Sequence, residues 1–193
     1  MKYQKFISVD LQKDFTDPDG KAYKPRPCVD FIKNTLIPYF KDNDLKIAEI
    51  ISDYKQPRPG DSGDCCWPGS KGFESIIPDS IKKMPVWVKS MNSPIWIRQN
   101  NGVPYQDGNA FQNWLDKNVG PMNTKTDVVL FGLTSDCCVL STAQELKWRG
   151  YKVYILKDAV DNYSGDQIEK TMVLNNPPLT NWAQIVSWND IVN

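Results

Sequence analysis

The chain has 193 residues, of which 40% are hydrophobic and 24% are charged, and this composition fits one soluble globular domain over residues 1–193. Its 23 Lys and Arg residues balance 23 Asp and Glu residues, so no net field draws the protein to nucleic acid or to an anionic membrane. We therefore expect neither partner, and we look for the function in a local site.

Short apolar runs alternate with longer amphipathic ones along the chain, which is typical of parallel strands joined by helices. Six runs are rich in β-branched and aromatic residues, and we expect strands at 5–10, 46–52, 85–90, 127–132, 151–158 and 183–188. We expect helices at 28–42, 108–118 and 137–150, and one more near 166–174. The sequence thus predicts an α/β fold with a mostly parallel six-stranded sheet and helices on both faces.

Residues 54–72, YKQPRPGDSGDCCWPGSKG, are rich in Pro and Gly and follow the second expected strand. Because Trp67 and two cysteines lie inside this segment, we expect an ordered loop rather than a linker. Phe15 and Trp67 are candidates to line a pocket for a planar substrate, and packing in the core is the alternative for both.

The cysteines and the start of the chain indicate a cytoplasmic protein. MKYQKFISVDLQ has no apolar run of the length found in a signal peptide, and no segment reaches the roughly 18 to 20 apolar residues of a membrane span. An odd number of cysteines with two adjacent pairs disfavours a disulfide framework. We expect reduced thiols at all five positions, which are Cys28, Cys65, Cys66, Cys137 and Cys138.

Polar side chains follow four of the expected strands, at the edge where open parallel sheets bind ligands. The first strand ends in Asp10, the second in Asp53 and the third in Lys89. The fourth strand leads to Cys137 and Cys138, at the start of a helix. We therefore expect a carboxylate, an ammonium and a thiol to meet at this edge.

A thiol in the first turn of a helix faces unpaired backbone N–H groups and the positive end of the helix dipole, which favour the thiolate. A nearby Lys89 ammonium acts in the same direction, so we expect the thiol pKa to fall from about 8.5 toward neutrality. The same N–H groups can hold an oxyanion. Because the chain has no histidine, Asp10 is the candidate base, provided that it is buried.

Four segments resemble the cysteine hydrolase superfamily, which contains nicotinamidases, isochorismatase-like hydrolases and carbamoyl-amide amidases. SVDLQKDF resembles the family's first-strand motif, and PGSKGFE resembles the loop before its third strand. VKSMNSPI resembles the segment with the catalytic Lys, and GLTSDCCVLSTAQELKWRGYKVYILKDAV resembles the nucleophile helix and the next strand. The segments occur in the family's order and span nearly the whole chain.

The resemblance implies roles for individual residues. Asp10, Lys89 and Cys138 are the implied catalytic residues, with Cys138 as the nucleophile. The backbone N–H groups of Thr134 and Cys138 are the implied oxyanion donors, and a cis peptide is implied at Leu133-Thr134. The implied activity is hydrolysis of the C–N bond of a small amide through a thioester, by a homo-oligomer without a cofactor.

The family's nicotinamidases resemble one another in a metal site made of an Asp and several histidines after the second strand. This chain keeps Asp53, but Tyr54 and Lys55 follow it, and Cys65 stands roughly where a further histidine falls. Asp53 and Cys65 alone are too few ligands for a closed zinc site. We expect no metal, and the substrate stays open among nicotinamide, carbamoyl compounds, ureido compounds and maleamate-like acids.

Other interpretations remain open for the cysteines and for Arg98. A binding protein or a thiol redox protein on the same fold is the alternative to an amidase, with Cys137 and Cys138 as the redox pair. Cys65 and Cys66 can pack under Trp67. Arg98 is a candidate to pair with an acidic substrate.

Overall fold

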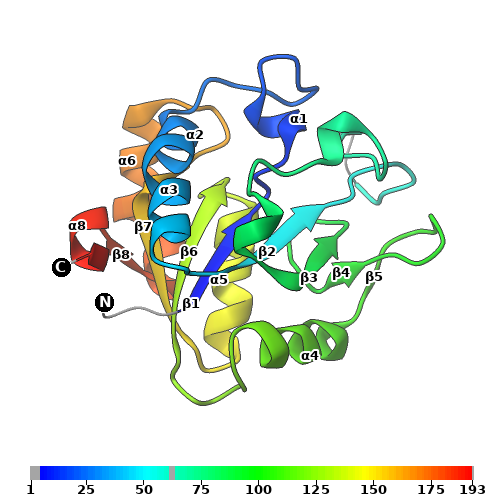
Figure 1. Cartoon of the computed structure of the whole chain (residues 1–193). Coiled ribbons are helices and arrows are strands. Elements are labelled where there is room, and N and C mark those ends of the chain that lie inside the picture. Colours follow the sequence, from blue (N-terminus) through cyan, green and yellow to red (C-terminus); the bar gives the residue numbers. More distant parts are fainter. Residues whose placement is uncertain (1–4, 61–63, 193) are drawn as a thin grey trace.

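The central sheet has six strands, and each is parallel to its neighbours, in a computed structural model that describes residues 5–60 and 64–192 (Figure 1). Their order is β3-β2-β1-β6-β7-β8, with β1 and β6 in the centre. The strands are β1 (Lys5–Val9), β2 (Ile47–Ser52), β3 (Lys82–Lys89), β6 (Asp127–Leu133), β7 (Lys152–Asp161) and β8 (Gln184–Val186). The prediction of an α/β fold with a six-stranded parallel sheet is confirmed.

Helices cover both faces of the sheet: α2 and α3 lie on one face in Figure 1, and α5 lies on the other. The longer ones are α4 (Gly108–Asn118), α5 (Cys138–Trp148) and α6 (Gln167–Asn175), close to their predicted bounds. The helix expected at 28–42 consists of α2 (Pro27–Phe31), the π-turn η1 (Ile32–Leu36) and α3 (Ile37–Asp42). In the described part of the chain, no helix is long and apolar enough to cross a membrane.

Pro38 gives a physical reason for the π-turn inside the predicted helix. Proline lacks a backbone N–H, and its ring clashes with the carbonyl four residues before it. The turn before Pro38 widens, so that the N–H of Ile37 bonds to the carbonyl of Ile32. A single local widening of this kind keeps the rod continuous where an α-helix would break.

The sequence did not predict the shortest elements, because two to five residues carry no readable periodicity. They are α1 (Lys13–Thr16), η2 (Lys71–Phe73), η3 (Asp79–Ile81), β4 (Trp96–Ile97), β5 (Tyr105–Gln106), α7 (Leu179–Trp182) and α8 (Trp188–Val192). β4 and β5 form a separate antiparallel pair. The strand expected at 183–188 ends early, because Trp188 begins α8.

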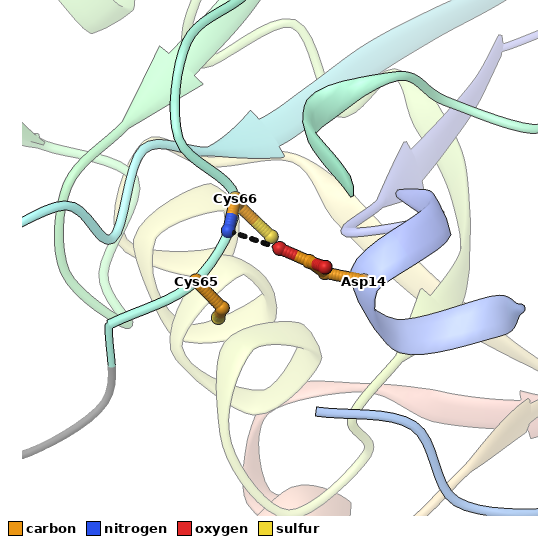
Figure 2. Close-up of side chains that lie close together, drawn as sticks. All are labelled: Asp14, Cys65 and Cys66. Carbon is orange, nitrogen blue, oxygen red and sulfur yellow. Dashed lines mark hydrogen bonds between the residues drawn. The ribbon is translucent and has the colours of Figure 1, made fainter. Parts of the chain in front are cut away.

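The loop expected at 54–72 packs against α1 through a buried carboxylate. Asp14 Oδ2 accepts a hydrogen bond from the Cys66 N–H at 2.6 Å (Figure 2), and Asp14 Oδ1 accepts one from the Lys21 N–H at 3.1 Å. This agrees with the prediction of an ordered loop for the described part of the segment. Residues 61–63 of the loop lie outside the described residues.

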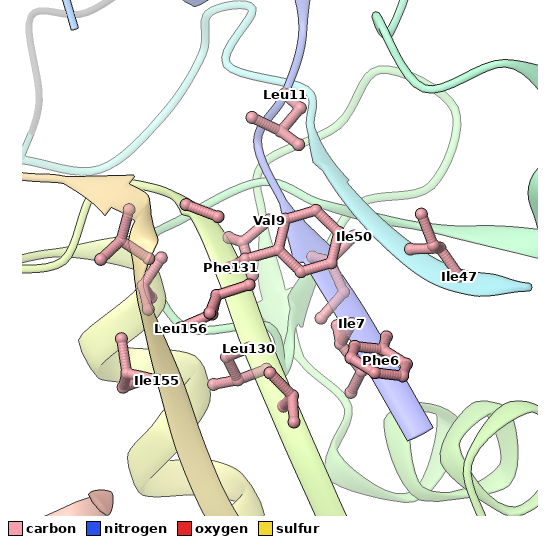
Figure 3. Packing of buried hydrophobic residues seen from close by; sticks show 14 of the residues in the cluster. Phe6, Ile7, Val9, Leu11, Ile47, Ile50, Leu130, Phe131, Ile155 and Leu156 are labelled. Atoms are coloured by element: carbon pink, nitrogen blue, oxygen red, sulfur yellow. The ribbon is translucent and has the colours of Figure 1, made fainter. Parts of the chain in front are cut away.

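The core lies on both sides of the central strands, which explains why their sequences are continuously apolar rather than alternating. Figure 3 shows Ile7 and Val9 of β1 beside Leu130 and Phe131 of β6, all of them buried. Phe6 packs edge to face against Phe40 of α3, with ring centres 4.8 Å apart. This packing fixes the positions at which β1 and β6 end.

The chain turns in opposite directions after β1 and β6. β1 is followed by its neighbour β2 on one side, and β6 is followed by β7 on the other. A sheet of this order has a crevice outside the carboxyl ends of the two central strands, where ligands bind. Asp10 and Thr134 directly follow these strands, so both lie at the crevice.

Gly132 permits the close approach of β1 and β6 beneath this crevice. Its φ is +116°, and an added Cβ would lie 2.1 Å from Val9 O. Gly69 also has a positive φ, of +83°, but an added Cβ there meets no atom within 4 Å. Both positions would strain the backbone of an alanine, but only position 132 would also crowd its side chain against a neighbouring strand.

Gly132→Ala is predicted to destabilise the protein far more than Gly69→Ala. Positive φ alone costs an alanine about 1 kcal/mol, and crowding against the β1 backbone adds about 1–3 kcal/mol or more at position 132. Urea unfolding of the two variants measures the difference. Equal losses of stability would contradict the described packing of β6 against β1.

Candidate active site

Lys89, the last residue of β3, is fully buried, and four polar atoms surround its ammonium group. Nζ lies 2.8 Å from Asp10 Oδ2, 2.7 Å from Ser52 Oγ and 2.7 Å from Tyr54 OH. The same nitrogen lies 3.3 Å from Cys138 Sγ. A buried charge without such partners costs several kcal/mol, so these contacts allow the ammonium to stay charged inside the protein.

Asp10 turns into the site because the chain changes conformation directly after β1. Its φ is +53°, which is uncommon for a residue other than glycine. Oδ2 accepts from Lys89, Oδ1 accepts from Ser52 Oγ at 2.8 Å, and the backbone N–H donates to Ile50 O at 2.9 Å. The side chain is buried, as the role of a base required.

Cys138 is the first residue of α5, at the position that the sequence predicted for the reactive thiol. The Leu133-Thr134 peptide before it is cis, as the resemblance implies. Among the described residues, the N–H groups of Cys137 and Val139 both donate to Thr134 O, and no hydrogen bond is found for the N–H groups of Thr134 or Cys138. Both remain free to donate to a bound oxyanion.

Tyr54 and Ser52 belong to the site, and sequence reasoning missed both. Tyr54 OH accepts from Lys89 and lies 3.1 Å from Cys138 Sγ. Alternation along an extended chain is the signal that was available: Ser52 and Tyr54 point to one side and Asp53 to the other. Burial, together with Cys138 and Asp10, raises the pKa of Tyr54 well above its usual value, so the phenol keeps its proton.

The pKa of the Cys138 thiol is raised, opposite to the direction expected from the sequence. The hydrogen bond to Cys137 is the largest cause, followed by burial, and the charge of Asp10 acts in the same direction. Lys89 opposes these effects without overcoming them. The helix and the lysine were visible in the sequence, whereas the contact between the two sulfur atoms was not. Cys138 is therefore protonated at neutral pH in the free protein.

The pKa of Lys89 is raised, although burial alone would lower it. The charge of Asp10 and the neighbouring Cys138 outweigh the loss of water. Lys89 therefore stays an ammonium beside a thiol that stays protonated.

A cavity of about 200 Å³ opens onto the sulfur of Cys138. Its wall includes Asp10, Thr134 and Phe15, and the ring of Phe15 lies edge-on to Tyr54 with centres 6.4 Å apart. Trp67 does not line this cavity: its indole is 37% exposed, and Lys21 Nζ lies 3.9 Å from the ring centre. Of the two expected pocket aromatics, only Phe15 lies beside the thiol.

Asp53 is paired with a guanidinium group rather than directed toward the catalytic residues. Arg98 Nε lies 3.3 Å from Asp53 Oδ2, and Asp53 Oδ1 accepts the Lys55 N–H at 3.1 Å. Neither Asp53 nor Arg98 lines the cavity. The residues around Asp53 do not fit the metal of the related nicotinamidases, because Arg98 already supplies the positive charge and the chain has no histidine.

A second group of metal-ligand atoms belongs to Asp14, Cys65 and Cys66, which lie within 4.8 Å of one another (Figure 2). Both carboxylate oxygens of Asp14 accept backbone N–H groups, so this residue anchors the loop. Cys66 is fully buried with a φ of +54°, and Cys65 lines the cavity beside Cys138. Asp14 thus supports the loop through hydrogen bonds to the backbone.

Comparison with known proteins shows which fold and which family the chain shares. The fold is similar to the nicotinamidase/pyrazinamidase of Bacillus subtilis (TM-score 0.67, 18% identity, 95% of this chain and 99% of that one). It is also similar to an isochorismatase-like hydrolase from Alkaliphilus metalliredigens (TM-score 0.67, 18% identity, 98% of this chain and 97% of that one). A third similar structure is the zinc-bound pyrazinamidase of Pyrococcus horikoshii (TM-score 0.68, 20% identity, 96% of this chain and 99% of that one). No curated protein sequence matches the chain.

The structural likeness at such low identity shows a shared fold. The sequence itself carries the family, because residues 5–184 match the model of the isochorismatase domain. This match covers most of the chain and includes Asp10, Lys89 and Cys138. The chain belongs to the isochorismatase family of hydrolases.

Proposed function

We propose that the protein hydrolyses the C–N bond of a small amide through a thioester on Cys138. The observation that carries the proposal is the buried contact of Lys89 Nζ with both Asp10 (2.8 Å) and the Cys138 sulfur (3.3 Å), beside a cavity of about 200 Å³. Solved structures of similar fold that are named nicotinamidase and pyrazinamidase support an amide substrate. The expected homo-oligomeric state and cytoplasmic location are part of this proposal and rest on the family resemblance and on the reduced cysteines.

The first half of the reaction forms the thioester. Asp10 takes the proton of the Cys138 thiol, and the sulfur attacks the carbonyl carbon of the amide. The N–H groups of Thr134 and Cys138 hold the resulting oxyanion. When the tetrahedral intermediate collapses, the C–N bond breaks, Asp10 returns its proton to the nitrogen, and ammonia or an amine leaves.

The second half releases the acid. Asp10 takes a proton from water, the hydroxide attacks the thioester carbon, the C–S bond breaks, and Asp10 returns the proton to the departing sulfur. The products are a carboxylic acid and the free thiol. Lys89 holds Asp10 and Cys138 together throughout, and the Tyr54 hydroxyl is placed to donate to the sulfur as negative charge develops there.

A thiol redox role is the alternative that a specific observation favours. The sulfur of Cys138 contacts that of the adjacent Cys137, and this contact lowers the pKa of Cys137. A redox protein would show reversible oxidation of this pair and no release of ammonia from amides.

Replacing Cys138 with alanine is predicted to abolish amide turnover, by at least about 10³-fold, because the proposed thioester forms on this sulfur. Release of ammonia from a panel of small amides, nicotinamide included, measures the loss. Cys28→Ala is the matched control, since Cys28 is also buried but lies outside the cavity. Equal turnover by Cys138→Ala and the control would rule out the thioester.

Asp10→Asn is predicted to make the Cys138 thiol more reactive toward alkylation and, at the same time, to slow amide hydrolysis. The carboxylate raises the pKa of Cys138, so its removal takes away one of the effects that oppose Lys89 and lowers this pKa. More thiolate is then present at pH 7, and iodoacetamide alkylates Cys138 faster than in wild type, as peptide mass spectrometry can measure. Amide hydrolysis falls by about 10²–10⁴-fold in the same variant, because the general base is gone. Slower alkylation together with unimpaired turnover would remove Asp10 from the mechanism.

A further inference from the structure

The wall of the catalytic cavity carries more positive than negative charge among the described residues. Its charged side chains are Arg26, Arg58 and Asp10. Asp10 is already paired with the ammonium of Lys89. The two guanidinium groups are the cationic side chains among the described residues that line the cavity.

Arg26 is a buried cation held only by neutral groups. It is 6% exposed, and it donates to Asn162 O from Nε at 3.2 Å, to Phe15 O from Nη1 at 3.3 Å and to Tyr163 O from Nη2 at 3.0 Å. No carboxylate oxygen among the described residues lies within 4.0 Å of its guanidinium nitrogens. Burial lowers the pKa of Arg26, and the more distant charges of Asp161 and Asp136 oppose this effect without reversing it.

These three bonds fix the orientation of the Arg26 guanidinium but place no carboxylate in direct contact with it. A guanidinium has five N–H groups, so one on each terminal nitrogen is not used by the carbonyls. A buried cation without a counter-ion is costly to the protein on its own. A carboxylate is the planar group that matches two parallel N–H donors, and it would offset the charge.

Arg58 brings the second cation close to the reacting sulfur. Its guanidinium carbon lies 3.9 Å from the centre of the Tyr54 ring, and the hydroxyl of that ring lies 3.1 Å from Cys138 Sγ. Arg58 is buried as well. A small molecule that presents a carbonyl carbon to Cys138 thus has a guanidinium group within the same small cavity.

We propose that the substrate is an amide that also carries a carboxylate, and that Arg26 and Arg58 bind this carboxylate while Cys138 attacks the amide carbon. This specificity rests on the proposed amidase function and narrows it. Neutral amides of the same size would lack the group that offsets the buried charge of Arg26.

Matched pairs of amides test the proposal in the protein as it exists. Succinamate and butyramide have the same chain length, and only succinamate carries a carboxylate. The expected kcat/KM for succinamate exceeds that for butyramide by about tenfold to hundredfold, as charge-assisted hydrogen bonds provide. In Arg58→Gln this ratio collapses toward one, whereas Lys147→Gln, which removes an exposed charge on α5, keeps it.

A second measurement tests whether the cavity attracts anions, and it does not require turnover of any amide. Iodoacetate and iodoacetamide alkylate the same thiolate and differ in charge, so the ratio of their rates at one pH cancels the thiolate fraction. We expect the rate with iodoacetate, divided by the rate with iodoacetamide, to be about tenfold higher at Cys138 than for glutathione. This ratio should fall in Arg26→Gln and in Arg58→Gln. Site-resolved mass spectrometry separates Cys138 from the other cysteines. Because Arg26 joins three segments, Arg58→Gln gives the decisive variant if Arg26→Gln does not fold.

The outcomes distinguish this inference from the proposed function. Turnover that depends on Cys138 but is faster for butyramide, or an alkylation ratio equal to that of glutathione, overturns the carboxylate specificity and leaves the amidase in place. A high ratio that depends on Arg58, without turnover of any amide, supports the anion site and counts against the amidase.

Discussion

The buried ammonium of Lys89 is the charge on which the rest of the site depends. Its partners come from the ends of β1 and β2, the start of the following loop and the first turn of α5. A cation in a dry interior stabilises the fold only while these partners remain in place. Since the pKa of Lys89 is raised, this contribution is complete below the usual lysine pKa and is lost as pH rises through the raised value.

In the reaction that we propose, the same ammonium explains how a protonated thiol can serve as a nucleophile. Lys89 contacts Asp10 and Cys138, so the base and the thiol are held on one cation in the absence of histidine. The thiol is kept neutral by Cys137, by burial and by Asp10. In the proposed reaction, proton transfer to Asp10 accompanies the attack, so negative charge moves from Asp10 to the oxyanion and no additional ion forms in the dry interior.

Much of this arrangement could be predicted from the sequence, because the main strands and helices are long enough to show their periodicity. The ends of those strands locate Asp10 and Lys89, and the start of the helix locates Cys138. Parallel pairing then brings the ends together, as the register of Ser52 beside Lys89 shows.

The features of the site that the sequence did not predict depend on contacts that leave no periodic pattern in the sequence. Tyr54, Arg26 and Arg58 lie outside the main strands and helices, and they reach the cavity only once distant segments have packed. The direction of the Cys138 pKa depends on a contact between two side chains. Asp53 was expected near the chemistry because it ends a strand, yet the alternation of side chains directs it toward Arg98.

The most direct test of this account is an NMR titration of the lysine side chains, with the signal of Lys89 assigned by comparison with Lys89→Met. The account predicts that Lys89 keeps the chemical shift of an ammonium at a pH at which exposed lysines have lost their protons, because its pKa is raised by Asp10 and Cys138. A Lys89 signal that titrates below those of the exposed lysines would show that burial dominates. It would contradict the proposed active site, in which Lys89 is a permanent buried cation.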